Sequence, residues 1–448
     1  MNSTTADVVV IGAGIAGASA AAALAQTRKV IVLEREAFAG MHSTGRSAAL
    51  FSEIYGSGPI RALSRASREF LYSPPEGFVD APIVRPRGAL HIASAAQLAK
   101  LDAFCALPDV APAIRRLTAA QARAQCSVLR EDYIAGAAIE TGSADVDVDV
   151  LHQGWLRQLK ARGGDLVVNA EVVRLSRRDS GWRVETPDAQ IDAQVVINAA
   201  GAWADVIAQL AGVRTVGLQP NRRTALIVSA PTGSNSDEWP MVIDIDEQFY
   251  FRPDAAGLLL SPGDETPTEP CDAQPEELDI AIAIDRVQTA TTLEVQRVRR
   301  SWAGLRSFVP DRSPVVGYAP DAPGFFWLAG QGGYGIQTAP AMGKLACALV
   351  LGEPAPDDLV RFGVRATTFG RIALLRTWRA LKATERIDAQ PPASDVNRAC
   401  LSCTLMHGLA GGRMEVDDAG DVLEDRTGGQ LRDAARKRLV SRQSRANR

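Results

Sequence analysis

Three glycines near the N-terminus have the spacing of a phosphate-binding turn. In the segment GAGIAG, residues 12–17, the first glycine permits a tight turn, the second lets the backbone approach a pyrophosphate, and the third lets a helix pack closely on a sheet. The free amide groups and the positive dipole end of that helix attract phosphate. Glu34 closes the next strand, and its carboxylate can accept hydrogen bonds from ribose hydroxyls but repels a 2′-phosphate. The pattern therefore predicts a dinucleotide site that disfavours NADP.

This turn needs a strand before it and a helix after it, and the sequence supplies both. Residues 7–11 (DVVVI) are typical of a buried parallel strand, an alanine-rich helix is expected from about Ile15 to Ala25, and residues 30–33 (VIVL) form a second buried strand. The order predicts a βαβ unit. The same half-site serves NAD and FAD. Residues 40–49 (GMHSTGRSAA) are small, polar and rich in backbone donors, which slightly favours the longer FAD; a surface loop is the alternative.

Further strands are expected in the middle of the chain, with one more nucleotide-fold segment near its end. Short apolar runs joined by polar turns predict an antiparallel sheet. A buried strand over 325–329 (FFWLA) enters a glycine-rich stretch over 330–337, and a helix follows from about Ala339 to Leu351. The strands expected in the middle are 165–169, 172–176, 182–186, 190–197, 224–229, 241–244, 248–252 and 257–261.

Composition bounds the class of protein. The 448 residues allow two or three structural units, and a formal net charge of -3 offers no field that gathers nucleic acid, so no nucleic-acid partner is expected. No apolar run is long enough to span a membrane, no secretory signal precedes the first strand, and the six cysteines stand mostly apart. These features predict a cytoplasmic location with reduced thiols.

The C-terminal tail has two features that admit other interpretations. Residues 371–387 alternate basic and apolar side chains and predict an amphipathic helix; packing on the domain surface is the favoured interpretation, and contact with an anionic membrane is the alternative. Cys400, Cys403 and His407 have the arrangement of half a zinc site. No second pair stands at a suitable spacing, so no metal is expected.

Five stretches resemble one known family of flavoproteins. They are VVVIGAGIAGASAA, VLEREAFAGMHSTGRSAA, NAAGAWAD, WAGLRSF and QGGYGIQT. In their residues and their order they resemble the D-amino-acid oxidase and glycine oxidase superfamily, and within it most closely the bacterial FAD-dependent D-arginine dehydrogenases. The resemblance runs from about residue 5 to residue 365, and the tail beyond about residue 370 lies outside it.

The resemblance implies an α/β fold that binds FAD non-covalently. It implies a discontinuous Rossmann-like FAD-binding domain and a substrate domain whose antiparallel sheet roofs the flavin. The divergent C-terminal tail lies outside the resemblance, and its composition predicts that it is partly helical and partly disordered. The FAD-binding domain is expected to comprise residues 1–50, 140–215 and 300–366, the substrate domain 51–139 and 216–299, and the C-terminal extension 367–448.

The activity that the resemblance implies is the oxidative deamination of D-amino acids. A hydride passes from the substrate Cα to flavin N5, and water converts the resulting imine to a 2-keto acid and ammonia. The electrons then pass to an acceptor other than O2, such as a quinone. Three alternatives stay open: an amino-acid oxidase that makes H2O2, an FAD dehydrogenase of a 2-hydroxy acid or a secondary amine, and an FAD-binding protein without activity.

The resemblance also assigns residues to the substrate. Arg306, in WAGLR, matches a carboxylate ligand, and its planar guanidinium suits bidentate binding of a carboxylate. Arg223 matches a second active-site arginine, with the neighbouring Arg222 as the alternative. Tyr250 matches a tyrosine that hydrogen-bonds the carboxylate, and Tyr55 matches a gate tyrosine on a mobile loop.

Two further positions, Gly333 and Gln337, match residues that contact the substrate or the flavin ring. The expected cofactor contacts fall mainly within the five stretches. They are Gly12, Gly14, Ile15, Ala16, Gly17, Glu34, Arg35, Thr44, Gly45, Arg46, Ser47, Ala48, Ala49, Val172, Gly201, Trp203, Gly332, Gly333, Tyr334, Gly335, Ile336 and Gln337.

The chain departs from the D-arginine dehydrogenases at two positions. Leu50 stands where they have a histidine, and Ala89 stands where they have the glutamate that grips the cationic side chain. Without that acid, the pocket is expected to be neutral and to prefer neutral or apolar side chains. Among the single histidines, His42 lies in the cofactor loop, whereas His91 and His152 are interpreted as structural.

Overall fold

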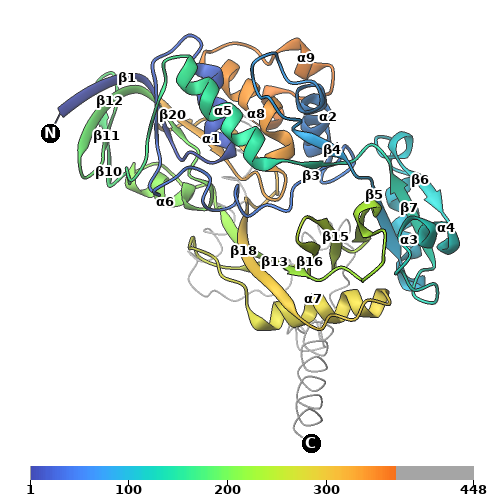
Figure 1. The fold of residues 1–448 in the computed structure, drawn as a ribbon. Helices are drawn as coiled ribbons and strands as arrows, with labels where there is room; N and C mark the ends of the chain where they lie inside the picture. Colours follow the sequence, from blue (N-terminus) through green and yellow to red (C-terminus); the bar gives the residue numbers. More distant parts are fainter. Residues whose placement is uncertain (1, 370–448) are drawn as a thin grey trace, which may run out of the picture. The chain divides into compact units, whose positions relative to one another are not determined.

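The computed structural model describes residues 2–369, and strand β1 (Asn2–Ile11) lies at the centre of their first sheet (Figure 1). This sheet has eight strands and runs β10-β11-β12-β1-β2-β9, with β20 beside β12 and β19 beside β20. Strand β1 pairs in parallel with β12 (Ala189–Asn198) and with β2 (Val30–Leu33). The other strands are β9 (Asp165–Val167), β10 (Arg174–Arg178), β11 (Gly181–Glu185), β19 (Val315–Tyr318) and β20 (Phe325–Ala329).

Both faces of this sheet are buried, which explains the continuous apolar run in β1. Val8 and Val10 belong to one core, and Val9 and Ile11 belong to the other. Successive side chains of a strand point to opposite faces, so a strand covered on both sides needs apolar residues throughout. The first core is covered by α1 (Ile15–Leu24), α2 (Gly58–Tyr72), α5 (Val148–Ala161), α8 (Gly335–Val350), α9 (Asp357–Val360) and α10 (Ala366–Phe369), and the second by α6 (Ala204–Leu210).

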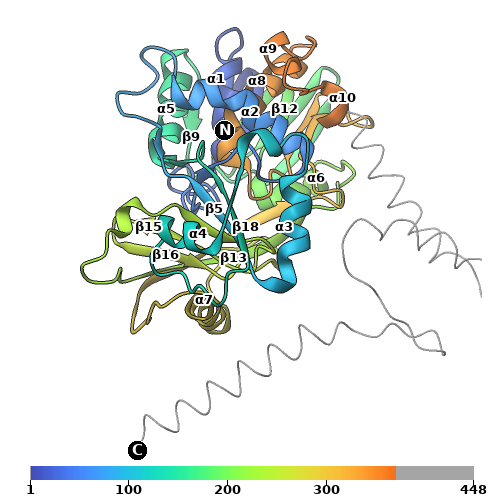
Figure 2. The same ribbon diagram turned by 90° about the vertical axis from the view of Figure 1, so that its right-hand side faces the viewer.

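A nine-stranded sheet forms the lower layer in Figure 1, with helix α7 (Glu277–Ala290) along its outer side (Figure 2). Its order is β17-β13-β16-β15-β14-β5-β7-β6, with β18 beside β13, and every pair is antiparallel except β14 with β5. Apolar side chains of one face pack on α7. The strands are β5 (Ala89–Ala93), β6 (Arg115–Leu117), β7 (Gly136–Glu140), β13 (Gln219–Val228), β14 (Met241–Asp244), β15 (Tyr250–Asp254), β16 (Gly257–Ser261), β17 (Thr266–Pro267) and β18 (Val298–Phe308).

Shorter elements complete the described part of the chain. A three-stranded sheet is formed by β3 (Leu50–Phe51), β8 (Ala144–Val146) and β4 (Val84–Pro86), and α3 (Leu98–Cys105) and α4 (Ala119–Gln125) pack near β7. The expected α/β fold with a second, largely antiparallel sheet is confirmed. The helix expected from Ala339 begins earlier, because the glycine-rich stretch turns directly into α8.

The domain boundaries expected from the sequence stay a proposal. Helix α2 lies in the stretch 51–139 that we expect in the substrate domain, yet it packs against α8. The predicted basic helix over 371–387 and the residues Cys400, Cys403 and His407 lie outside the described residues. Within residues 2–369, no helix is both long and apolar enough to cross a membrane. No three His, Cys, Asp or Glu side chains gather as a metal site in that same range.

Candidate functional site

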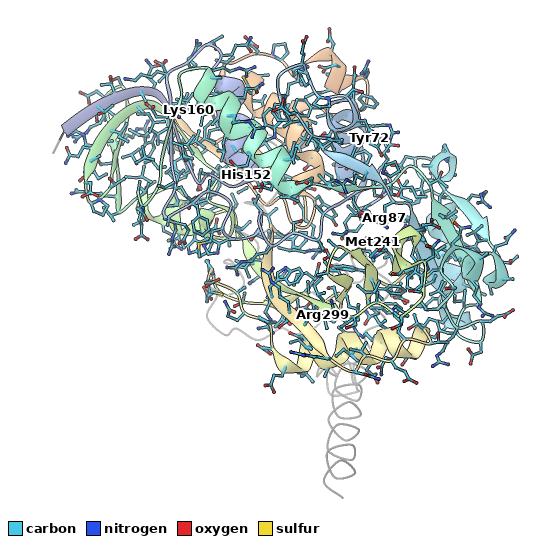
Figure 3. The ribbon with its side chains drawn as sticks, in the orientation of Figure 1. Tyr72, Arg87, His152, Lys160, Met241 and Arg299 are labelled. Carbon is cyan, nitrogen blue, oxygen red and sulfur yellow. The ribbon has the colours of Figure 1, made fainter. Side chains whose placement is uncertain are left out.

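The turn between β1 and α1 has the geometry of a phosphate site. Gly12 adopts a φ of 100°, and a Cβ on Gly17 would lie 1.9 Å from the Gly12 carbonyl oxygen, so both positions require glycine. His152, labelled on α5 in Figure 3, places its Nε2 2.8 Å from the Ala13 carbonyl oxygen and steadies the turn. Burial lowers the pKa of His152, so its ring is neutral near pH 7. The interpretation of His152 as structural agrees with this contact.

Glu34 lies at the end of β2 beside this turn. Its carboxylate is buried and accepts hydrogen bonds from the Ala13 amide at 2.9 Å and from the Glu36 amide at 3.1 Å. These bonds fix the carboxylate, and each of its oxygens keeps a lone pair that can accept a ribose hydroxyl.

Glu34 lines the first of three adjoining cavities. His42 lines it as well; its Nε2 lies 2.8 Å from Glu36 Oε1, while its buried Nδ1 has no partner in the described part of the chain. Arg35 stacks over the Trp203 ring at 5.0 Å. The expected cofactor contacts that line this cavity are Gly12, Gly14, Glu34, Arg35, Thr44, Val172, Gly201 and Trp203.

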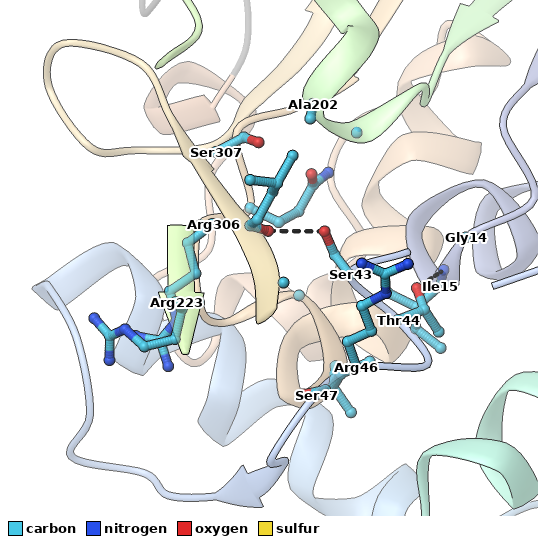
Figure 4. A pocket seen from close by; sticks show the side chains of 18 of the residues that line it. Gly14, Ile15, Ser43, Thr44, Arg46, Ser47, Ala202, Arg223, Arg306 and Ser307 are labelled. Atoms are coloured by element: carbon cyan, nitrogen blue, oxygen red, sulfur yellow. Dashed lines mark hydrogen bonds between the residues drawn. The ribbon is translucent and has the colours of Figure 1, made fainter. Parts of the chain in front are cut away.

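The second cavity, seen from close by in Figure 4, shares Gly14, Thr44 and Gly201 with the first, so the two adjoin. Thr44 Oγ1 accepts a hydrogen bond of 3.0 Å from the Ile15 amide at the start of α1. Gln331 also lines this cavity, and its buried Nε2 has no partner among residues 2–369. The other expected contacts in its wall are Ile15, Ala16, Arg46, Ser47, Ala48, Gly332, Gly333, Gly335 and Ile336.

The third cavity, which we call the inner cavity, shares Arg223, Tyr250 and Arg306 with the second, which we call the middle cavity. Arg306 donates a hydrogen bond of 3.1 Å to the Tyr55 hydroxyl and forms no ion pair within the described residues. Burial raises the pKa of Tyr55, against the opposing charge of Arg306, so the phenol stays protonated. An unpaired guanidinium in such a place is costly unless an anion joins it.

Strand alternation separates Arg223 from its neighbour. Arg223 lines the second and third cavities, donates to the Asp264 carbonyl oxygen at 2.6 Å and contacts Glu265 at 3.3 Å. Arg222 points to the other side of β13, where it pairs with acidic residues of the α7 region, among them Asp279 at 3.0 Å. Of the two arginines, the structure places Arg223 at the cavity.

The loop that carries Tyr55 is tied down from two sides. Gln337 lines the inner cavity, donates to Ser64 Oγ at 2.8 Å and accepts from the Ser52 amide at 3.1 Å. Glu140 accepts from Ser52 Oγ at 2.7 Å and from the Glu53 amide at 2.9 Å. Burial raises the pKa of Glu140, against these hydrogen bonds. The two anchors hold the Tyr55 hydroxyl beside Arg306.

Some expected contacts do not reach the cavities. Gly17 and Gly45 lie outside the lining residues, and Gly17 acts through helix packing instead. Tyr334 packs its ring on Tyr55, with centroids 4.9 Å apart, and is not a lining residue. Ala49 lines the inner cavity rather than the middle one.

Sequence reasoning missed five residues of the inner cavity, one of which is Ser52. His91, interpreted as structural, lines it together with Met241, Ile243 and Glu247. The strand residues His91, Met241 and Ile243 carry only the period of two, which does not say which face meets a cavity, and no pattern marks Glu247 in the turn that follows. Leu50 lines the cavity as well. Ala89 is fully buried in β5 and lies outside the lining.

These features define an α/β dinucleotide-binding protein in which a further cavity, the inner one, adjoins the two cavities beside the glycine turn. Residues 7–349 match the family described as DAO: FAD dependent oxidoreductase. The match covers most of the chain, so the protein belongs to this family of FAD-dependent oxidoreductases, and its cofactor is FAD.

Two relatives and one solved structure illustrate the similarity. The chain is similar to FAD-dependent oxidoreductase domain-containing protein 1 of Xenopus laevis, at 28% identity over 177 residues, 36% of this chain and 35% of the relative. It is similar to mitochondrial sarcosine dehydrogenase of Homo sapiens, at 25% identity over 393 residues, 80% of this chain and 42% of the relative. The matches thus span less than half the length of both relatives. Glycine oxidase from Geobacillus kaustophilus shares the fold: its crystal structure matches with a TM-score of 0.68 and 23% identity, over 80% of this chain and 98% of that one.

The residues present fit FAD. The fixed Glu34 carboxylate suits the adenosine ribose, the glycine turn suits the pyrophosphate, and the middle cavity suits the flavin ring. His42 and Gln331 line the first and second cavities, and each has one buried polar atom, Nδ1 and Nε2, without a partner in the described residues, which is typical of a site completed by a polar ligand.

Proposed function

We propose that this protein is an FAD-dependent dehydrogenase of D-amino acids, which it converts through an imine to 2-keto acids and ammonia. One observation carries the proposal. Arg223, Tyr250 and Arg306 line both the inner cavity and the middle cavity that suits the flavin ring. A substrate carboxylate bound to these residues brings its Cα–N bond next to the cofactor.

The side chains of the inner cavity bind and orient the carboxylate. Within the described residues the Arg306 guanidinium bonds only the Tyr55 hydroxyl, which leaves donors for a bidentate pair with a carboxylate. The Tyr55 hydroxyl oxygen accepts a hydrogen bond from Arg306. Because the phenol stays protonated, its O–H donates a hydrogen bond to the substrate carboxylate. Arg223 adds positive charge. The buried Tyr250 donates a hydrogen bond from its hydroxyl group to the carboxylate. Gly333 leaves room for the Arg306 guanidinium, because a Cβ there would lie 2.8 Å from its Cζ.

No protein nucleophile is required for this reaction. The substrate amine is neutral when it reacts, the Cα hydrogen leaves with its electron pair, and the amine proton goes to solvent. Water then adds to the imine and releases ammonia. When bound, FAD supplies the hydride acceptor. The chain contributes orientation, charge and exclusion of water.

The substrate side chain is proposed to be neutral. The resemblance to D-arginine dehydrogenases extends to the carboxylate-binding residues but not to the acid that Ala89 replaces. Leu50, Met241 and Ile243 give the cavity an apolar wall. Glu247 lies exposed at its lip, where its charge acts on Arg306 and Tyr55. Neutral D-amino acids are therefore proposed over D-arginine.

The electrons are proposed to pass to an acceptor other than O2, such as a quinone, in a cytoplasmic enzyme. Contact with a membrane is not expected. An oxidase that forms H2O2 is the alternative for this step. A secondary amine as substrate is the second candidate, and the similarity to a sarcosine dehydrogenase favours it. A 2-hydroxy acid remains a third alternative, and an FAD-binding protein without activity a fourth.

The test is anaerobic reduction of the bound flavin by D- and L-forms of charged, polar and apolar amino acids. Bleaching by neutral D-amino acids, with D-arginine no better, is expected. Equal or faster bleaching by L-forms would overturn the stereochemistry, and faster bleaching by sarcosine would favour the secondary amine. Peroxide formed in air during turnover would identify an oxidase.

A further inference from the structure

His91 is a buried histidine that the proposed reaction does not use. Its side chain is only 7% exposed, and it lines the inner cavity. Its Nε2 atom has no hydrogen-bond partner in the part of the chain that the structure describes. Buried polar atoms of folded proteins are almost always paired. Nε2 is enclosed as the ring stands, whereas Nδ1 is not enclosed in this way, so a ligand in the cavity meets the imidazole through Nδ1 or after the ring turns.

Strand register places His91 at a set distance from the carboxylate-binding residues. Ile243 of β14 pairs with Tyr250 of β15 on one side and with His91 of β5 on the other. The three residues form one row across adjacent strands, with side chains on the same face. Two strand spacings separate Tyr250 from His91, about 10 Å. An amino acid bound by its carboxylate at Tyr250 therefore directs a short side chain along the sheet toward His91.

The direct neighbours of His91 are uncharged: Ile243 and Ala138 flank it on the adjacent strands, while the charged side chains of the same cavity are those of Arg223, Arg306 and Glu247. Leu50, Met241 and Ile243 line the same cavity, and the Phe104 ring packs on His91 with centroids 5.3 Å apart. Burial lowers the pKa of His91 to about 4, so the imidazole is neutral at neutral pH. A neutral imidazole has one donor and one acceptor, and which nitrogen carries the proton depends on its partner. Such a site distinguishes a hydroxyl or amide from a methyl group.

We propose that His91 determines side-chain specificity, and that the preferred substrates are amino acids whose short, uncharged side chain carries a hydroxyl or carboxamide that hydrogen-bonds its imidazole. This inference rests on the proposed function and narrows it. Among the described residues that line this cavity, Glu247 at the exposed lip is the one acidic side chain that a cationic substrate side chain could meet. An apolar side chain would leave the histidine nitrogen unpaired, which is how polar sites reject analogues that lack the polar group.

The test uses two ligands of equal shape that cannot be oxidised, because neither has a hydrogen on Cα. They are α-methylserine and isovaline, which differ by a hydroxyl in place of a methyl group. The FAD-loaded protein is titrated with each enantiomer, and the change in the flavin spectrum gives the dissociation constant. We expect wild-type protein to bind the hydroxyl ligand about tenfold more tightly. His91→Leu should bind both within twofold of each other, and His91→Asn should restore part of the preference.

Met241→Leu is the matched control, because Met241 lines the same cavity without a hydrogen-bonding group and lies between the layers in Figure 3. It should keep the tenfold preference. The inference is overturned if wild type shows no preference, or if His91→Leu keeps it; the wild-type result decides even if a variant does not fold. Flavin reduction by amino acids, measured on the same protein, separates the two claims. Reduction without a His91-dependent preference sinks only the specificity claim, and no reduction by any amino acid sinks the proposed function with it.

Discussion

Replacing Gly333 by alanine should weaken amino-acid binding while FAD stays bound. A Cβ at this position would lie 2.8 Å from Arg306 Cζ and 2.9 Å from its Nε and Nη1. Ordinary contacts begin at 3.4 Å, so the guanidinium must retreat by about 0.6 Å, the difference between 3.4 and 2.8 Å. That shift stretches a hydrogen bond to a carboxylate beyond its useful range. The loss of one charge-assisted hydrogen bond costs about 1.5–3 kcal/mol, or roughly 10- to 100-fold in the dissociation constant.

Anaerobic stopped-flow reduction of the flavin at several substrate concentrations separates this dissociation constant from the limiting rate of reduction. Gly335→Ala is the matched control, because the nearest atom to its Cβ would be Gln331 Cβ at 3.3 Å. The ratio of FAD to protein verifies that both variants keep the cofactor. The reasoning is refuted if FAD-loaded Gly333→Ala binds substrate within twofold of wild type.

Three further predictions test other parts of the site. Gly17→Ala should purify with little FAD, because the new methyl group would lie 1.9 Å from the Gly12 carbonyl oxygen; full FAD occupancy would contradict this. Tyr55→Phe removes the hydroxyl that Arg306 contacts at 3.1 Å, so KM should rise about 3- to 10-fold at unchanged FAD content; an unaltered KM would show that Tyr55 does not act on the substrate. Burial lowers the pKa of His91 from 6.5 to about 4, so the stability that the neutral ring contributes is present above pH 6.5 and lost as pH falls through 4. The free energy of unfolding of wild type relative to His91→Leu, from urea denaturation, should therefore drop by about 3 kcal/mol between pH 7.5 and pH 4, and a constant difference would count against a buried neutral ring.

Local patterns predicted most elements because each element carries its own periodicity. The alanine-rich helix expected over 15–25 is α1, which ends at Leu24, and the strand expected over 257–261 is β16. The glycine turn was also predictable, since Gly12 and Gly17 answer steric demands that lie within one βαβ unit. In these cases sequence neighbours are also neighbours in space.

Long-range placement could not be predicted in the same way. His91 reaches the cavity because β5 pairs in parallel with β14, a strand far along the chain, and no local pattern encodes that pairing. Glu247 lies in the turn after β14 and is brought to the lip by the same sheet. Tyr334 stands in a glycine-rich stretch that suggests cofactor contact, yet its ring packs on Tyr55. The choice between Arg222 and Arg223 needed the register of β13, which the sequence left open.

The central claim is that a carboxylate held by Arg306 brings a Cα–N bond next to FAD. The most direct measurement compares anaerobic flavin reduction by D-serine with reduction by ethanolamine, which has the same carbon–nitrogen bond and hydroxyl group but no carboxylate. We expect rapid bleaching by the amino acid and reduction at least about 100-fold slower by the amine, because the amine forgoes a bidentate charge-assisted pair. Equal rates for the two compounds, or no bleaching by any amino acid, would contradict the account.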